Sequence, residues 1–197
     1  MDANSLLMNR FKMQCNKFSG TISSGLGVIK KRLVKEMVFG IQASKDVNLS
    51  NISRSLKEDI PFIKTEDRLS MNLASEDISA QLNREIMRLA ANKVDDTMVI
   101  AVDPGVIMKP YAKEMEKQYN IYDGSQGRPA RGYHLCQVTG ANLAHDKIVP
   151  LYCEAYSSED SNYPGSSEKI MGIVQKVKAK IGTKGTWAGM CLTDWQP

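Results

Sequence analysis

One aspartate in this chain of 197 residues is placed where a carboxylate could do chemistry. The apolar run 99–102 leads directly into Asp103, and Pro104-Gly105 follows at once. A short apolar run bounded by turn residues predicts a strand that is buried on both faces. A carboxylate at the end of such a strand would face a cleft, where it could hold a divalent cation for phosphoryl transfer. Asp-Pro-Gly also forms ordinary turns, so the spacing alone leaves a metal ligand and a turn-capping aspartate both open.

Other catalytic chemistry finds less support in the sequence. The four cysteines show no C-x-x-C spacing, and neither of the two histidines lies close to a cysteine in sequence, which argues against a zinc site. We therefore expect reduced, mostly buried thiols. We expect His134 and His145 to be a strand residue and a turn residue, because metal-dependent phosphoryl transfer draws its nucleophile from ion-bound water.

The elements that would position Asp103 are predicted from hydrophobic periodicity. Three strands should form an antiparallel meander, an amphipathic helix should pack on it, and a fourth strand should follow. Their ranges are 97–102, 132–143 and 147–156 for the meander, 166–181 for the helix and 186–192 for the fourth strand. Ser166 or Ser167 should cap the helix, and Gly182 should close it. The side chains expected to be buried include Val99, Ala101, Leu135, Val149 and Leu151.

This order of elements is that of the first part of a ribonuclease H-like core, so the predicted fold class is α/β. In such a core, a central strand carries one carboxylate at its end, and the strand after the first helix brings a second carboxylate beside it. Such carboxylates clamp two divalent cations about 4 Å apart, which hold the attacking and leaving oxygens of a phosphodiester.

The first half of the chain is predicted to be helical. Residues 1–25 are polar with little rhythm, so we expect a mobile or loosely docked arm. Residues 26–93 should form short helices, and the pattern changes to strands in a second domain, 94–197. The first helix is expected over 26–43, where Val28 and Ile29 join the apolar stripe and Lys30 lies on or near the other face. A second should run from a cap at Asn48 or Ser50 towards Pro61. Two more are expected, over 64–75 and from a cap at Ser75 to residue 93.

Cationic side chains lie between the apolar positions of these helices: Arg54, Lys57, Lys64 and Arg68. Such a region could be a helix-turn-helix-like DNA-binding module. A small helical bundle without a DNA role would show the same pattern, so both interpretations stay open.

Composition and charge bound the class of protein. Hydrophobic residues make up 42% of the chain and charged residues 24%, as in ordinary globular proteins. No apolar run reaches roughly 18 residues and the N-terminus lacks a secretory pattern, so we expect a cytoplasmic protein without a membrane span. Of the net charge of +4, residues 1–93 contribute +5 and residues 94–197 contribute −1. A basic front suits a polyanionic partner.

The second half carries several motifs in a fixed order, from KPYAKEME after Asp103 through DGS-x-G and GY to VPLY. Together they closely resemble the DDE-type transposases of bacterial insertion sequences, in the cut-and-paste branch. The resemblance covers residues 30–188 and includes RLSMNL at 68–73, which is similar to that family's DNA-contacting N-terminal region. The residues that carry the match are Asp103, Lys109, Pro110, Tyr111, Asp123, Gly124, Ser125, Gly127, Gly132, Tyr133 and 149–152.

The last predicted strand departs from the family's pattern. There the family has a tryptophan, a few apolar residues and Asp-Arg-Gly, whose aspartate is the second catalytic ligand. This chain keeps Gly185 and Trp187 but has Met190 near that position, which leaves Asp194 as the candidate for a second metal ligand. The family's catalytic glutamate, which lies beyond an inserted β-region, is not in this sequence. We therefore expect a truncated copy that is frame-shifted after residue 188.

The resemblance implies DNA transposition by metal-dependent strand cleavage and transfer. Asp103 would hold Mg²⁺ or Mn²⁺, Lys109 would lie near a phosphate, and Arg128 and Arg131 could touch phosphate or stay solvated. Because the second aspartate and the glutamate are missing, we expect weak or no metal binding and no cleavage by this chain. Three hypotheses remain: an active transposase, a non-catalytic fragment that binds transposon ends, and a remnant without function. The expected partners are transposon ends, target DNA and a second copy of the chain.

Overall fold

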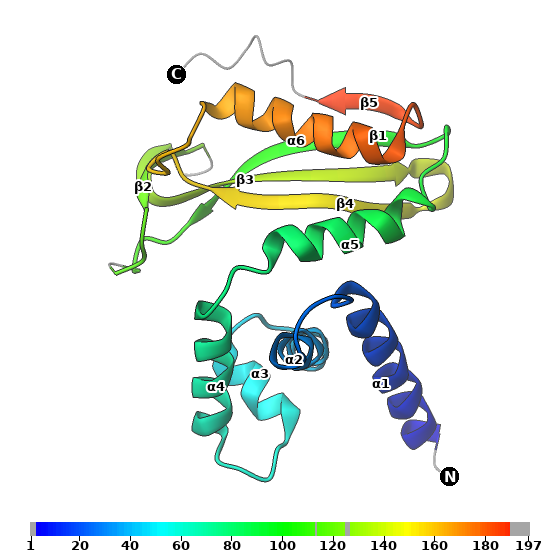
Figure 1. The fold of residues 1–197 in the computed structure, drawn as a ribbon, viewed down its shortest axis with the longest axis vertical. Helices are drawn as coiled ribbons and strands as arrows, with labels where there is room; N and C mark the ends of the chain where they lie inside the picture. The colour runs from blue at the N-terminus through cyan, green and yellow to red at the C-terminus, as the bar shows by residue number, and fades with distance from the viewer. Residues whose placement is uncertain (1–2, 113, 125–126, 190–197) are drawn as a thin grey trace. The chain divides into compact units, whose positions relative to one another are not determined.

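The computed structural model describes residues 3–112, 114–124 and 127–189. The chain divides into two compact units, Met1–Glu85 and Ile86–Pro197, of which the first is helical and the second is built on a β-sheet (Figure 1). The division falls inside helix α5 (Ser79–Ala91) and therefore earlier than the predicted boundary at residue 94. None of the helices within the described ranges has the length and apolarity needed to cross a membrane.

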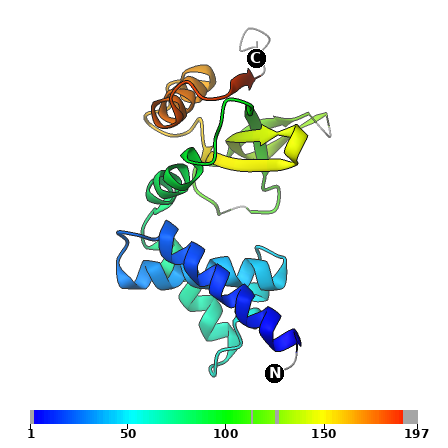
Figure 2. The same cartoon turned by 90° about the vertical axis from the view of Figure 1, so that its right-hand side faces the viewer.

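The helical unit contains four helices before α5 (Figure 2), and local sequence signals mark the start of two of them. Asn48 caps α3 as predicted, because its side-chain oxygen accepts a hydrogen bond from the Ser50 N–H at 3.0 Å. Pro61 stands directly before α4, a position where its missing N–H costs nothing. The helices before α5 are α1 (Ala3–Ile22), α2 (Val28–Ser44), α3 (Leu49–Leu56) and α4 (Phe62–Ala74).

The core of this unit joins α2, α3 and α4. Leu33, Ile52 and Leu69, one from each helix, are essentially inaccessible to solvent. Gly40 lets α3 approach α2 closely, because a Cβ at this position would overlap the side chain of Ile52. Partly buried side chains complete the cluster: Met37, Ile41, Leu49 and Leu56.

The first turn of α2 differs from the prediction. Val28 and Ile29, which were expected in the buried stripe, are 85% and 64% exposed. Lys30, which was expected on or near the solvated face, is buried instead. Its ammonium donates hydrogen bonds to the backbone oxygens of Asn72 and Glu76, at 2.5 and 3.3 Å. A cation at the C-terminus of α4 donates hydrogen bonds to free carbonyls there and interacts favourably with the negative end of the helix dipole.

The start of α5 also differs from the prediction. Ser75 follows α4 and accepts a hydrogen bond from Lys30 at 2.9 Å, so it does not cap α5. Asp77, two residues before α5 begins, instead satisfies a free donor of its first turn, because its carboxylate accepts a hydrogen bond from the backbone N–H of Ser79 at 2.8 Å. The capping signal was correctly located in this segment but assigned to the wrong side chain.

The N-terminal segment forms a helix rather than the expected arm. α1 covers most of residues 1–25, and Cys15 and Ile22 on one side of it are buried. Phe11 contacts Phe39 of α2, with 5.7 Å between the ring centroids. Tertiary packing against α2 therefore holds a segment whose sequence rhythm is weak.

The sheet unit has the element order that the sequence predicts, with one additional strand. β1 (Val99–Met108) pairs antiparallel with β3 (Arg128–Asn142), and β3 pairs antiparallel with β4 (Lys147–Tyr156). After helix α6 (Ser166–Ile181), the short strand β5 (Thr186–Gly189) pairs with β1 in parallel. The additional strand, β2 (Tyr119–Asp123), pairs with the first residues of β3. The meander and the range of α6 are thus confirmed, although Gly165 rather than a serine occupies the N-cap position.

The prediction that β1 stops at Asp103 is wrong, because the strand continues through Pro104 to Met108. The Thr186 N–H donates to the Met98 carbonyl at 2.8 Å, so even-numbered residues of β1 direct their backbone groups towards β5. The nitrogen of Pro104 therefore points away from β3, and the missing N–H removes no bond from the β1–β3 ladder. A proline is tolerated at such a position within a strand.

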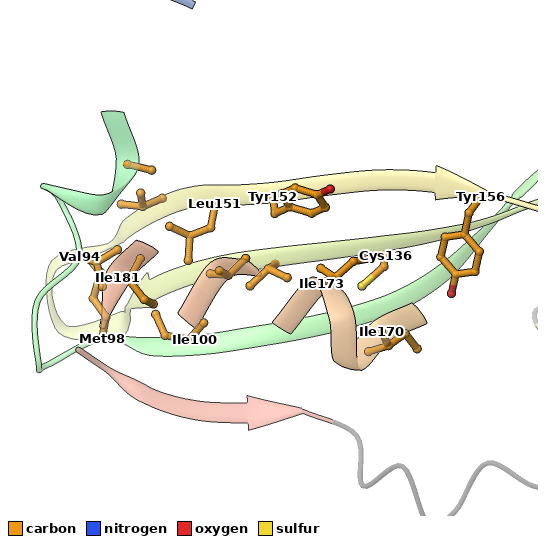
Figure 3. Close-up of a cluster of buried hydrophobic side chains, with 14 residues drawn as sticks. Val94, Met98, Ile100, Cys136, Leu151, Tyr152, Tyr156, Ile170, Ile173 and Ile181 are labelled. Atoms are coloured by element: carbon orange, nitrogen blue, oxygen red, sulfur yellow. The ribbon is translucent and has the colours of Figure 1, made fainter. Parts of the chain in front are cut away.

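The buried face of the sheet is covered by α6 and the end of α5 (Figure 3). Ile100, Cys136 and Val138 face this core and are inaccessible to solvent. Val149 and Leu151 are buried as predicted. Three other predictions are wrong by one residue in phase, because their side chains belong to the opposite face: Val99, Ala101 and Leu135.

Candidate functional site

Asp103 lies on the exposed face of the sheet. In the register it stands opposite Gln137 of β3, and Gln137 stands opposite Cys153 of β4. Side chains at paired positions share one face, so these three residues form a row across three neighbouring strands. All three are exposed. The carboxylate is therefore available to a ligand or partner approaching this face.

Asp103 also marks the place where the described parallel pairing stops. The last described pair between β1 and β5 is Val102 with Gly189, and Asp103 is the next residue of β1. The expected second ligand, Asp194, and Met190 both lie outside the described residues. Asp103 therefore lies one residue beyond the described part of this pairing and inside β1 rather than at its end, and its role as a metal ligand stays a prediction.

The described residues do not provide a set of ligands for two divalent cations. Within residues 3–112, 114–124 and 127–189, no three or more histidine, cysteine or acidic side chains gather into a group that could hold a metal ion. The row of Asp103, Gln137 and Cys153 offers one carboxylate, one amide oxygen and one thiol. Mg²⁺ prefers hard oxygen ligands and gives up its water reluctantly. This donor set does not fit a two-metal centre.

Two of the predicted phosphate-contacting residues are brought together at one end of the sheet. The backbone N–H of Lys109 donates to the carbonyl of Arg131 at 2.8 Å. The Arg131 guanidinium donates to the carbonyl of Gln118 at 3.3 Å, which ties β3 to the segment before β2. Arg128 begins β3, opposite Asp123. All three predicted cationic side chains are exposed, and their contact with phosphate stays a prediction.

The Gly-Tyr motif in this region has a structural reason. Gly132 pairs with Met108 of β1 on one side and with Tyr119 of β2 on the other. A Cβ at this position would overlap the backbone oxygen of Ile107. The hydroxyl of Tyr133 donates to the carbonyl of Glu116 at 2.5 Å and so fixes the segment that leads into β2. The motif therefore shapes the end of the sheet that carries Lys109 and Arg131.

The predicted DNA-contacting residues of the helical unit differ in their surroundings. Arg54, Lys57 and Lys64 are exposed. The Arg54 guanidinium lies over the ring of Phe62, 4.7 Å from its centroid. Arg68 is already engaged, because its two terminal nitrogens each lie 2.6 Å from a glutamate oxygen, one on Glu36 of α2 and one on Glu58. A DNA role for these four residues stays a prediction.

Sequence reasoning missed a half-buried carboxylate on the covered face of the sheet. Glu154 of β4 forms an ion pair with Lys169 of α6 at 2.6 Å and accepts a hydrogen bond from the Tyr152 hydroxyl at 2.7 Å. Burial is the largest single influence and would raise the pKa of Glu154. The hydrogen bonds from Lys169 and Tyr152, together with the positive charges of Lys169 and Lys176, outweigh it, so the pKa lies below its usual value. Glu154 thus fastens α6 to the sheet. Its position in phase with Tyr152 and Tyr156 was the available signal.

The histidines and cysteines largely follow the expectation. His134 lies in β3 between the rings of Tyr119 and Tyr156, at centroid distances of 5.2 and 5.3 Å, and burial lowers its pKa. His145 ends a short 3₁₀ helix, Leu143–His145, after β3. Cys15 and Cys136 are buried free thiols, whereas Cys153 is exposed and Cys191 lies outside the described residues.

Comparison with known proteins adds no assignment. No protein-family model matches the chain, and a search of the curated proteins finds no match either.

Proposed function

We propose that this chain is a DNA-binding protein derived from a DDE-type insertion-sequence transposase, and that it binds DNA without cutting it. The sheet unit corresponds to the first part of a ribonuclease H-like core, and the helical unit corresponds to the DNA-binding region. Two observations support this: the sequence motifs around Asp103 and the strand arrangement. β4, β3 and β1 run antiparallel, and β5 returns after α6 parallel to β1.

The position of Asp103 carries the proposal. It is a carboxylate on the exposed face of β1, one residue beyond the last described pair with the parallel strand β5. In a ribonuclease H-like core the first metal-holding carboxylate is expected beside the strand that follows the first helix, and the position of Asp103 next to β5 supports this even though β1 continues past it. An aspartate that only capped a turn would not lie inside a ten-residue strand.

The same site supports binding without cleavage. Strand cleavage of this type uses two cations that stabilise both the attacking and the leaving oxygen, a contribution of several kcal/mol. The described residues place one carboxylate, Asp103, on this face near β5, and position 190 is a methionine. One carboxylate holds Mg²⁺ weakly. The chain would keep an affinity for DNA and lack the means to cut it.

Two measurements on the full chain test the proposal. The first is fluorescence-anisotropy titration of a labelled mixed-sequence DNA duplex at several salt concentrations. We expect binding that weakens steeply with salt, with a log–log slope of roughly −0.9 for each phosphate contacted. No binding at low salt, or binding insensitive to salt, would contradict the DNA-binding role.

The second measurement is nicking of a supercoiled plasmid in Mg²⁺ or Mn²⁺, with Asp103→Asn as the matched control. We expect no nicking by either protein. Nicking by the unaltered chain that is lost in Asp103→Asn would show a working metal centre and would overturn the non-catalytic part of the proposal.

A further inference from the structure

The positive charge of the helical unit is concentrated on its first two helices. Within residues 3–45 the only acidic residue is Glu36. Five cationic side chains on α1 and α2 are exposed and form no ion pair with any described residue. These residues, here named the α1–α2 cations, are Arg10, Lys12, Lys17, Lys31 and Lys35.

Glu36 is unable to compensate this charge, because both of its oxygens are already occupied. Oε1 lies 2.6 Å from Nε of Arg32, and Oε2 lies 2.6 Å from a terminal nitrogen of Arg68. The Glu36 side chain is only 12% exposed. The α1–α2 cations therefore face solvent with their charge unopposed by this carboxylate.

The stretch through α3 and α4, where the sequence placed the DNA contacts, is different. Its four cationic residues are matched by four acidic ones, so residues 48–74 carry no net charge. One of the four cations, Arg68, is held by two glutamates. The acidic residues of this stretch are Glu58, Asp59, Glu66 and Asp67.

The spacing of the α1–α2 cations places them in rows. Arg10 and Lys17 are seven residues apart and share a face of α1, while Lys31 and Lys35 are four apart and share a face of α2. Like charges four apart weaken an isolated helix slightly. The two helices pack together through Phe11 and Phe39, so both rows belong to one folded unit. Rows of exposed cations without ion-pair partners suit a regularly charged polyanion such as duplex DNA.

We infer that α1 and α2, rather than the α3–α4 turn, provide the main phosphate-contacting surface for duplex DNA. The inference rests on the proposed function, and it assigns the surface to residues other than the predicted DNA contacts. A lipid surface fits less well. Leu7 and Met13 of α1 are 69% and 70% exposed, but helical spacing places Arg10 and Lys17 between them, so the exposed apolar side chains do not form a face separate from the cations. Peripheral membrane helices instead keep a continuous apolar face free for the bilayer.

Two matched triple variants of the full chain test the inference. The first is Arg10→Gln, Lys31→Gln and Lys35→Gln. The second is the control, with the substitutions Arg54→Gln, Lys57→Gln and Lys64→Gln. Each set removes one arginine and two lysines, all exposed, and lowers the net charge by the same amount. Circular dichroism and thermal unfolding of both proteins establish that the substitutions leave them folded.

Binding of each protein to a mixed-sequence duplex is then measured from low to moderate salt. The first variant should bind at least tenfold more weakly than the unaltered chain, and its log–log salt slope should be shallower by up to about 2.7, because each lost phosphate contact contributes about 0.9. The control variant should retain most of the affinity and most of the salt slope of the unaltered chain. A parallel titration uses vesicles of phosphatidylcholine with phosphatidylserine.

The possible results separate the two proposals. Equal losses in both variants, or a larger loss in the control, would overturn the assignment to α1 and α2 while leaving DNA binding intact. Vesicle binding that depends on the α1–α2 cations, combined with unchanged DNA binding, would overturn it in favour of a lipid surface. If the unaltered chain binds no duplex at all, the proposed function itself fails.

Discussion

At the scale of single residues, the charged side chains of this protein divide into those that hold the fold and those left for partners. Lys30, Arg68 and Glu154 each contact a neighbouring helix or strand and are at least half buried. The neighbouring residues in the sequence do not indicate which charged side chains are buried, because the buried Lys30 is followed directly by the exposed Lys31. A charge count along the sequence therefore overestimates what is available to DNA unless the occupied cations are removed from it.

The Arg68 contacts give a prediction about stability. Arg68→Ala leaves the carboxylates of Glu36 and Glu58 partly buried without this partner, so the free energy of unfolding should fall by about 2 kcal/mol. Arg32→Ala is the matched control, because Arg32 binds the same two glutamates but is 56% exposed, and it should cost less than about 1 kcal/mol. Urea unfolding measures both values. Equal losses would mean that burial does not distinguish the two arginines.

Glu154 gives a prediction about pH. The pKa of Glu154 in the folded protein lies below the ordinary 4.5, so the unfolded chain binds a proton at this residue more readily. The ionised Glu154 therefore stabilises the fold above pH 4.5, and this stabilisation is lost as the pH falls through the folded-state pKa. Glu154→Gln should be less stable than the unaltered chain by about 1 kcal/mol at neutral pH. The difference should shrink as the pH falls below 4.5. Urea unfolding across this range checks it, and a constant difference would contradict the assignment.

At the scale of elements, two glycines in the neighbouring strands β1 and β3 differ in how closely other backbone atoms approach them. Gly132 sits between β1 and β2, and an added Cβ would meet the backbone oxygen of Ile107, which has no freedom to rotate away. Gly105 in β1 has no atom within 4 Å of such a Cβ. The backbone therefore leaves no room for a side chain at position 132, whereas position 105 has room for one.

This contrast predicts the outcome of two alanine substitutions. Gly132→Ala should lower the free energy of unfolding by more than about 2 kcal/mol, because the strands must separate to admit the methyl group. Gly105→Ala should leave stability within about 0.5 kcal/mol of the unaltered chain. Thermal or urea unfolding distinguishes them. A tolerated Gly132→Ala would mean that β1 and β3 can shift apart without cost.

The elements also separate what the sequence could predict from what it could not. α6 and β4 were predicted to the residue, because each has a clear period and clear boundaries. The phase of β1 was missed because residues 99–102 are apolar at every position, so only the packing of α6 and α5 reveals which side is covered. Asp103 lies next to the last described pair with the parallel strand, but inside β1 and not at its end as predicted. The continuation through Pro104 depends on which way its nitrogen points, and that is set by tertiary pairing.

At the scale of the whole molecule, the division between the units falls inside a helix. Met87, Ala90 and Ala91, in the second half of α5, contribute to the core of the sheet unit. The sequence boundary at residue 94 marks the change from helical to strand periodicity. The packing boundary lies earlier, because a helix can belong to a core built mainly from strands.

The packing boundary predicts how fragments behave. A fragment of residues 79–197 keeps all of α5, whereas a fragment of 94–197 loses Met87 and Ala90 from the core. The shorter fragment should be less stable by more than about 2 kcal/mol, the usual cost of emptying a buried site of this size. Comparing their urea unfolding curves tests this. Equal stability would place α5 outside the core of the sheet unit.

Pro104 has a consequence for how the molecule behaves among its own copies. Its nitrogen points to the β5 side of β1, two residues beyond the last described β1–β5 pair. Exposed strand edges recruit strands from other molecules and lead to aggregation, and a proline on the edge removes a donor that such a strand would need. Pro104 therefore leaves β1 without an N–H donor on this side, so a strand from another copy could not complete its hydrogen-bond ladder at this position.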